Sequence, residues 1–170
     1  MAVANEIFEF INGKLATERG IHLETAIASA AYLAGTSLFR TFNLPIKSMP
    51  PGTPIFSDIA NKRGPELVSI LGSVLEAQGM PVKGDEIVTQ TPAEHLPHKD
   101  LLDLQREMED GFVEILSHHA YDKLDGARIA AICCALYIKE GRGSLDPRIG
   151  FGIAVNGFLT GTKTVPLPLQ

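Results

Sequence analysis

Tryptophan is absent from the 170 residues, only 6% of the side chains are aromatic, and there are two cysteines. Cys133 and Cys134 are neighbours in the sequence, a spacing that gives no easy disulfide, and no further cysteine could pair with either. Unpaired cysteines without a zinc or redox motif are typical of a reducing interior. We therefore expect two buried thiols and a cytoplasmic protein, and a disulfide-stapled secreted fold is disfavoured.

Long hydrophobic runs and an excess of positive charge are also missing. The longest uncharged segment, Thr25–Phe39, is shorter than the roughly 20 apolar residues that span a bilayer. The first ten residues lack the basic start of a secretory signal. With 15 basic against 20 acidic side chains the net charge is −5, which disfavours nucleic acid and membranes as partners.

The chain is rich in hydrophobic residues, at 45%, and in signals for helix starts and ends. No pair of alternating, β-branched segments is joined by a hairpin dipeptide. The sequence therefore predicts an all-α fold, a single-domain bundle of five to six helices over residues 1–170. The expected helices are Ala4–Arg19, Leu23–Phe42, Ser57–Gln78 ended by Gly79, a long helix from a capping box at Thr91, Pro92 and Glu94 to about His119, a helix from Asp122 or Asp125 to Gly141, and Pro147–Leu159 capped by Asp146.

Proline punctuates this pattern in three places. Four prolines within residues 43–56 predict a proline-rich strap that lies extended over the surface between helices 2 and 3. Gly64 and Pro65 predict a kink or a break in the third helix. Pro166 and Pro168 predict an extended tail, residues 163–170, that leaves the body of the protein.

Two of the expected helices are apolar on almost every side. The helix at 23–42 has a single narrow polar stripe, and the helix around Cys134 has no polar face for ten residues, 129–138. In a chain of this length the other helices can easily cover one such helix, but they can hardly cover two. We therefore expect part of this surface to be buried in a two-fold homodimer, with a monomer that has two central helices as the alternative. Leucine at Ala30 or Ala34 should overpack the core.

The polar stripe of the helix at 23–42 is the first candidate site. It consists of Thr25, Ser29, Tyr32, Thr36 and Arg40, and it could line a cavity for a small polar ligand. Alternatively, the stripe meets acidic residues of a neighbouring helix or of the strap. Arg40, close to a buried boundary, would then need a carboxylate partner.

The second candidate is a metal site in the segment 94–125, which holds four of the five histidines. On a helical projection four potential ligands share one face, namely Glu107, Asp110, Glu114 and His118. The solvated face of an ordinary bundle helix explains the same pattern, and Ser117 stands where a di-iron motif requires histidine. His95 and His98 could form a second pair in a loop, and His119 is expected in the core. Replacement of Glu109 by glutamine is expected to be nearly silent.

The third candidate is the glycine-rich stretch Glu140–Phe158, which with Arg142 and Arg148 could cradle an anion. Close helix packing explains these glycines equally well, and Asp146 already occupies the cap. The sequence has no nucleophile elbow and no cysteine with a flanking base. It therefore favours a self-associating interaction or regulatory domain. The alternative is a metal-binding or small-ligand-binding helical protein or enzyme; neither catalysis nor a cofactor is decided.

Overall fold

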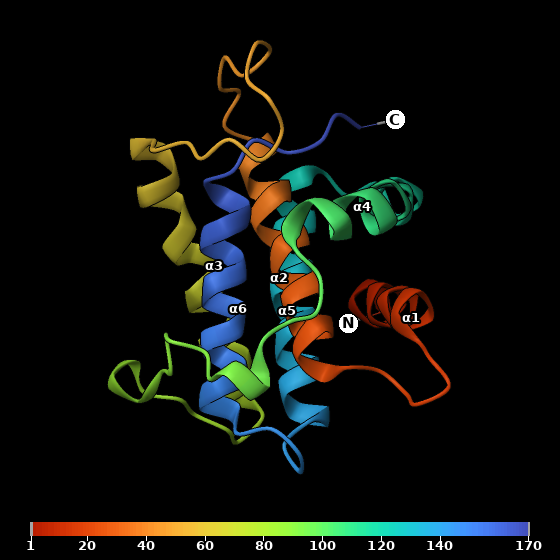
Figure 1. Cartoon of the computed structure of the whole chain (residues 1–170), viewed down its shortest axis with the longest axis vertical. Helices are drawn as coiled ribbons and strands as arrows, with labels where there is room; N and C mark the ends of the chain where they lie inside the picture. Colours follow the sequence, from red (N-terminus) through yellow and green to blue (C-terminus); the bar gives the residue numbers. More distant parts are fainter. Residues whose placement is uncertain (1, 170) are drawn as a thin grey trace.

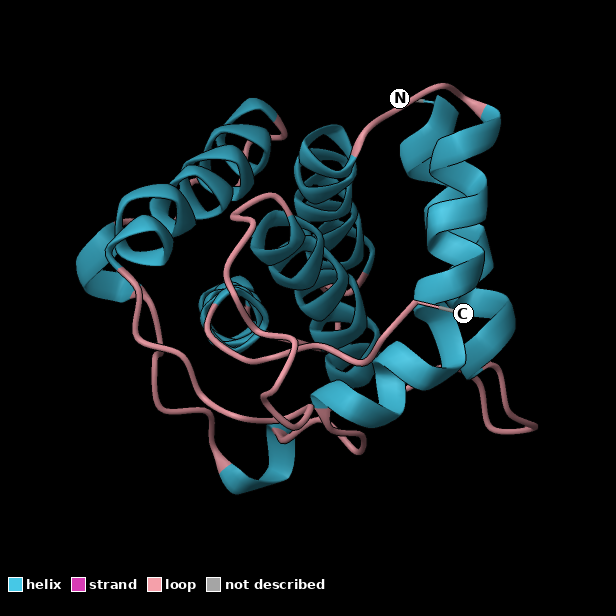
Figure 2. Ribbon diagram, turned by 90° about the horizontal axis from the view of Figure 1, so that it is seen from above, coloured by secondary structure: helices cyan, strands magenta, loops and turns pink. Residues whose placement is uncertain are grey.

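The computed structural model describes residues 2–169. Figure 2 shows helices and loops only over this range, and two isolated bridges, Thr17 with Gly20 and Pro54 with Thr164, form no strand. The structure thus confirms an all-α bundle. Its six α-helices are α1 (Ala2–Leu15), α2 (Leu23–Arg40), α3 (Asp58–Ala77), α4 (Leu101–His118), α5 (Lys123–Glu140) and α6 (Pro147–Thr162), with short 3-10 turns η1 (Gly84–Glu86) and η2 (Ala93–His95).

Helix α2 lies at the centre of the bundle. Figure 1 shows α2, α3, α5 and α6 running along the long axis, with α1 and α4 lying across it on one side. From residue 25 to residue 39 every side chain of α2 except that of Tyr32 is buried. One chain is therefore sufficient to enclose α2, which removes one reason for expecting a partner; the dimer itself stays a prediction.

Glycines bring α2 and α6 into direct backbone contact. A Cβ atom added to Gly35 would lie 2.7 Å from the carbonyl oxygen of Phe158 and 2.9 Å from the Cα atom of Gly161. Both distances are below ordinary van der Waals contact, so only glycine fits at this crossing without displacing α6. The small residues of α2 thus serve close packing.

Several helix ends are where the sequence places them. Asp122 and Asp125 form a reciprocal capping box at the start of α5, and Asp146 caps α6 with Pro147 at its first position. Gly79 ends α3 with a φ of 75°. Each cap depends on residues within a few positions of the helix end, so the sequence alone is sufficient to predict it.

Other boundaries differ from the prediction. Helix α4 begins at Leu101, capped by Asp100, and not at the box around Thr91. Pro97 explains the difference, because inside a helix it would remove a backbone donor and clash with the preceding turn. Helix α1 ends at Leu15, before Arg19. Helix α3 continues through Pro65, which is exposed, because Gly64 has no Cβ atom to clash with the proline ring.

The proline-rich segment and the tail are bound to each other. The amide of Gly52 donates to the carbonyl of Val165 (2.8 Å), Val165 donates to Thr53 (2.9 Å) and Ile55 donates to Lys163 (2.7 Å). In Figure 1 the segment rises from the upper end of the molecule as a loop, so the expected surface strap is not seen. The tail is extended, but it stays attached to the body.

The two cysteines are buried and unpaired, as predicted. The Cys133 thiol contacts the carbonyl of Ala4, and burial raises its pKa to about 12. No helix within residues 2–169 combines the length and the apolar character that crossing a membrane requires.

Candidate functional site

The polar stripe of α2 connects this helix to α4 and to the tail. Thr36 accepts a hydrogen bond from the side-chain amide of Gln105 (Nε2 to Oγ1, 2.9 Å). The amide oxygen of the same Gln105 accepts from the backbone N–H of Leu167 (2.9 Å). A single buried glutamine on α4 therefore joins α2 to the C-terminal segment.

Arg40 and Glu109 form an ion pair with two parallel hydrogen bonds. Arg40 Nε donates to Oε1 at 2.7 Å and Nη2 to Oε2 at 2.8 Å, while Nη2 also donates to the carbonyl oxygen of Leu167 at 2.6 Å. The side chains are only 13% and 7% exposed. Arg40 thus has the carboxylate partner that one of the two interpretations of the stripe requires. This geometry argues against the expectation that Glu109→Gln is nearly silent, because the Glu109 side chain is buried in an ion pair.

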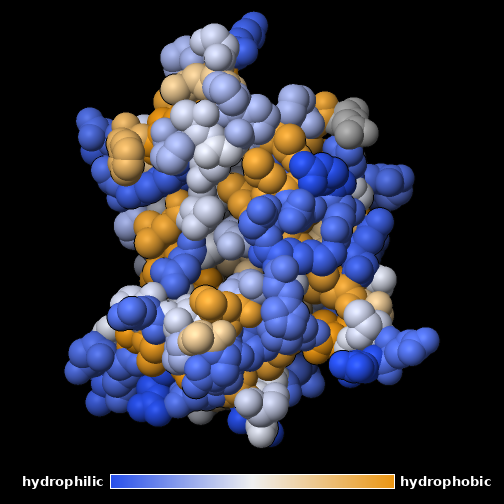
Figure 3. Space-filling view, in the orientation of Figure 1, coloured by the Kyte–Doolittle hydropathy of each residue, from blue (hydrophilic) through white to orange (hydrophobic). Residues whose placement is uncertain are grey.

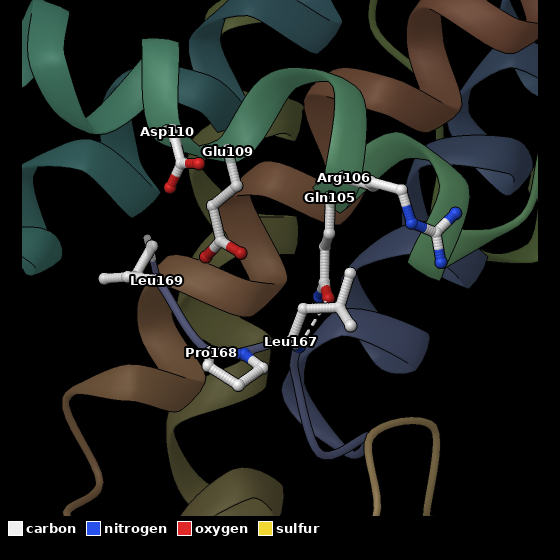
Figure 4. Close-up of a pocket in the computed structure, with 7 residues that line it drawn as sticks. All are labelled: Gln105, Arg106, Glu109, Asp110, Leu167, Pro168 and Leu169. Atoms are coloured by element: carbon white, nitrogen blue, oxygen red, sulfur yellow. Dashed lines mark hydrogen bonds between the residues drawn. The ribbon is translucent and has the colours of Figure 1, made fainter.

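A cavity of about 330 Å³ lies beside this network, between α4 and the tail. Figure 4 shows Gln105 and Glu109 pointing from α4 toward the tail, whereas Arg106 points away from both. The buried groups at the cavity, Gln105 and Glu109, already bind protein partners. A ligand here would have to compete with bonds that hold the fold, so we assign the network to structure.

A different cluster surrounds the other end of the stripe. His22 caps α2; its Nδ1 atom lies 2.8 Å from Thr25 Oγ1, and its ring stacks on that of His98 with 3.6 Å between centroids. Thr25 Oγ1 also accepts from the backbone N–H of His98 (2.9 Å). Glu24 reaches His22 Nε2 (3.3 Å) and His95 Nδ1 (2.8 Å). Three imidazoles and one carboxylate are thereby gathered from segments far apart in the sequence.

The surroundings lower the pKa values of two members of this cluster, His22 and Glu24. Burial lowers the pKa of His22, and the nearby His98 and His95 lower it further, against the opposing effect of Glu24. The pKa of Glu24 is also lowered: burial acts to raise it, but the hydrogen bond from His95 and the charges of its neighbours outweigh burial. Sequence reasoning named His95 and His98 but missed His22 and Glu24. The one signal in the sequence that could have identified His22 is its position directly before α2, where it caps the helix.

The remaining stripe residues do not join either cavity. The hydroxyl of Ser29 donates to the Thr25 carbonyl in its own helix (2.7 Å). Tyr32 is half-buried, and burial raises its pKa. Thr25 lines the cavity near His22. A ligand shared by all five stripe residues stays a prediction.

The predicted metal ligands lie on α4 without forming a cluster. Glu107 pairs with Lys99, and Glu114 and His118 are exposed. Asp110 borders the cavity beside the tail. Across residues 2–169 no group of three or more His, Cys, Asp or Glu side chains is arranged to hold a metal ion. The geometry gives the metal hypothesis no support.

Two further expectations are decided by local contacts. His119 is exposed and pairs with Glu6 (2.7 Å), so its placement in the core is wrong, because α4 ends one residue earlier. Arg148 binds the carboxylate of Asp146 and is thus already engaged by an acid. A Cβ atom on Gly157 would meet the Ala31 side chain at 2.5 Å, which agrees with the packing interpretation of these glycines.

Comparison with protein-family models, with curated proteins and with solved structures finds no match for this chain.

Proposed function

We propose that the protein is a self-associating interaction domain, and that two copies dock through the surface where α3 begins and α6 ends. The observation that carries the proposal is Phe56, an aromatic side chain that is 90% exposed. An exposed hydrophobic patch marks a contact surface more strongly than one residue does, and Phe56 is accompanied by the exposed Ile59 and Leu159.

Phe56 has no evident role at the start of α3. It precedes the cap residue Ser57, where an apolar side chain often packs on the fourth helical position to fix the helix entry. That position is Asn61, which is polar and exposed. The exposure of Phe56 is thus not explained by local structure.

An apolar groove lies at the same end of α3, and Lys163, which lines it, accepts a hydrogen bond from Ile55, the residue before Phe56. It has a volume of about 300 Å³ and runs between α3 and α6. Ile59 and Leu159, one on each helix, are partly exposed hydrophobic residues in the same region. Figure 3 shows hydrophobic side chains standing out at the upper left, over the start of α3. The apolar part of the groove is lined by Ala60, Pro65, Val68, Phe158 and Leu159.

A second copy of this chain fits the surface because the projecting Phe56 and the groove belong to the same end of the α3–α6 pair. A two-fold axis through such a surface places Phe56 of each copy in the groove of the other. Both signs of charge occur nearby, with Asp58 and Lys62 on α3 and Lys163 after α6, so the same axis can oppose unlike charges. The buried free thiols add the proposal of a reducing compartment.

The test is the mass of the full chain in solution, measured by sedimentation over roughly a hundredfold range of concentration. We expect a monomer–dimer equilibrium that Phe56→Ser shifts to monomer. The control is Leu96→Ser, which removes an exposed hydrophobic residue outside the groove. Circular dichroism checks that both variants fold. A one-chain mass at every concentration would refute the proposal, as would a Phe56→Ser protein that dimerises like the parent.

A further inference from the structure

We propose that the cavity bordered by Arg19, His22, His98 and Lys99 binds a small organic anion, a carboxylate or phosphate carried on a flat ring. We call it the histidine cavity. It lies at the end of the α2 stripe opposite the Arg40 ion pair, and it is independent of the surface around Phe56.

The histidine cavity has the size of a small-ligand site. Its volume is about 400 Å³, and it is formed by the end of α1, the turn that leads into α2, and the segment before α4. The turn is fixed by its own hydrogen bonds, because Thr17 Oγ1 donates to the Gly20 carbonyl (2.8 Å) and accepts from the N–H of Arg19 (3.2 Å). The cavity wall is therefore organised before a ligand arrives.

The charges at the cavity favour an anion. Its nine lining residues include Arg19 and Lys99 and no aspartate or glutamate, in a protein whose net charge is −5. Lys99 pairs with Glu107. Within the described part of the chain, no acidic side chain pairs with Arg19. A guanidinium group with free donors matches the two oxygens of a carboxylate or phosphate.

The other walls favour a flat apolar group. Leu15 and Ile21 provide aliphatic surface, and Ile21 is partly exposed. His22 and His98 stack with 17° between their ring planes and border the same space. An aromatic ring packs well against such surfaces while its anionic group reaches Arg19.

The remaining polar groups of the cluster orient this wall. Glu24 does not line the cavity; it binds His22 Nε2 and His95. The Thr25 hydroxyl holds both His22 and the backbone of His98. These contacts fix the imidazole pair in position. The cavity beside the tail has its buried polar groups occupied by the protein, whereas the histidine cavity offers the Arg19 guanidinium, which makes it the better ligand site.

The experiment is a calorimetric titration of the full chain at neutral pH with four probes. Phenyl phosphate and benzoate combine a ring with the two candidate anionic groups, inorganic phosphate has no ring, and benzamide has no charge. We expect one of the ringed anions to bind at one site per chain, and inorganic phosphate and benzamide to bind at least about tenfold more weakly. The ringed anion that binds identifies the head group.

Matched variants locate the binding. Arg19→Gln should weaken the bound probe about tenfold, whereas Arg142→Gln, at another exposed arginine, should leave it unchanged. Ile21→Ser should weaken the ringed probe and not inorganic phosphate. Failure of both ringed anions to bind would overturn the proposal. Equal affinity for inorganic phosphate, or unchanged binding by Arg19→Gln, would overturn it as well.

Discussion

Replacement of Gly35 by alanine tests the central packing of the fold. The added methyl group would lie 2.7 Å from the Phe158 carbonyl oxygen, 2.9 Å from the Gly161 Cα atom and 3.0 Å from the Thr162 nitrogen. All three atoms belong to the backbone of α6, so no side chain can rotate out of the way. The two helices would have to separate.

The magnitude follows from two opposing effects. Overpacking a well-packed core costs about 1 to 3 kcal/mol, and we take the upper end because every close atom is backbone. Alanine is better than glycine in a helix by about 1 kcal/mol. We therefore expect Gly35→Ala to lower the free energy of unfolding by about 2 kcal/mol.

Urea unfolding followed by circular dichroism measures this change. The control is Gly13→Ala in α1, where an added Cβ atom meets nothing within 4 Å. There the helix propensity acts alone, and stability should rise by up to about 1 kcal/mol. If both variants gained stability equally, α2 and α6 would not be in backbone contact, and the reasoning would be refuted.

Three further predictions concern ionisable groups. Glu109→Gln leaves the Arg40 charge buried without a counter-charge, so it should lower the free energy of unfolding by about 3 kcal/mol. The control, Glu114→Gln on the exposed face, should change it by less than about 0.5 kcal/mol. Urea titrations measure both changes. Burial lowers the pKa of His22 below its ordinary value of 6.5 in the folded protein, so protons bind the unfolded chain more tightly. Stability from this group is full above pH 6.5 and is lost as the pH falls through the folded pKa; unfolding midpoints measured along the pH scale should decline less in His22→Asn than in the parent. The buried Cys133 thiol, with a pKa raised to about 12, should not react with a thiol reagent until the protein unfolds; rapid labelling of the native chain would contradict its burial.

The sequence predicted those features that depend on local spacing. The helix class, the caps at Asp122 and Asp146 and the buried thiols follow from residues within one or two turns of each other. The need of Arg40 for a carboxylate followed from its position at the edge of an apolar helix.

The identity of that carboxylate could not be read in advance. Whether Glu109 faces water or α2 depends on how α4 is rotated against the bundle, and this rotation is set by packing between distant segments. The same limit applies to His22 and His98, which lie far apart in the sequence and stack only in the folded chain. The start of α4 was misplaced because the signal of a capping box at Thr91 conflicted with Pro97, and the proline prevailed.

The contact of α2 with α6 also determines where the molecule can flex. Two helices that meet backbone to backbone at Gly35 and Gly161 have no intervening side chains to change rotamer, so they should shift as one stiff unit. We therefore expect larger movements at the periphery, where α1 and α4 cross the other helices. Because α4 holds one end of the stripe through Arg40 and α1 borders the other, a small tilt of either helix would change the contacts at the end of α2 that it touches.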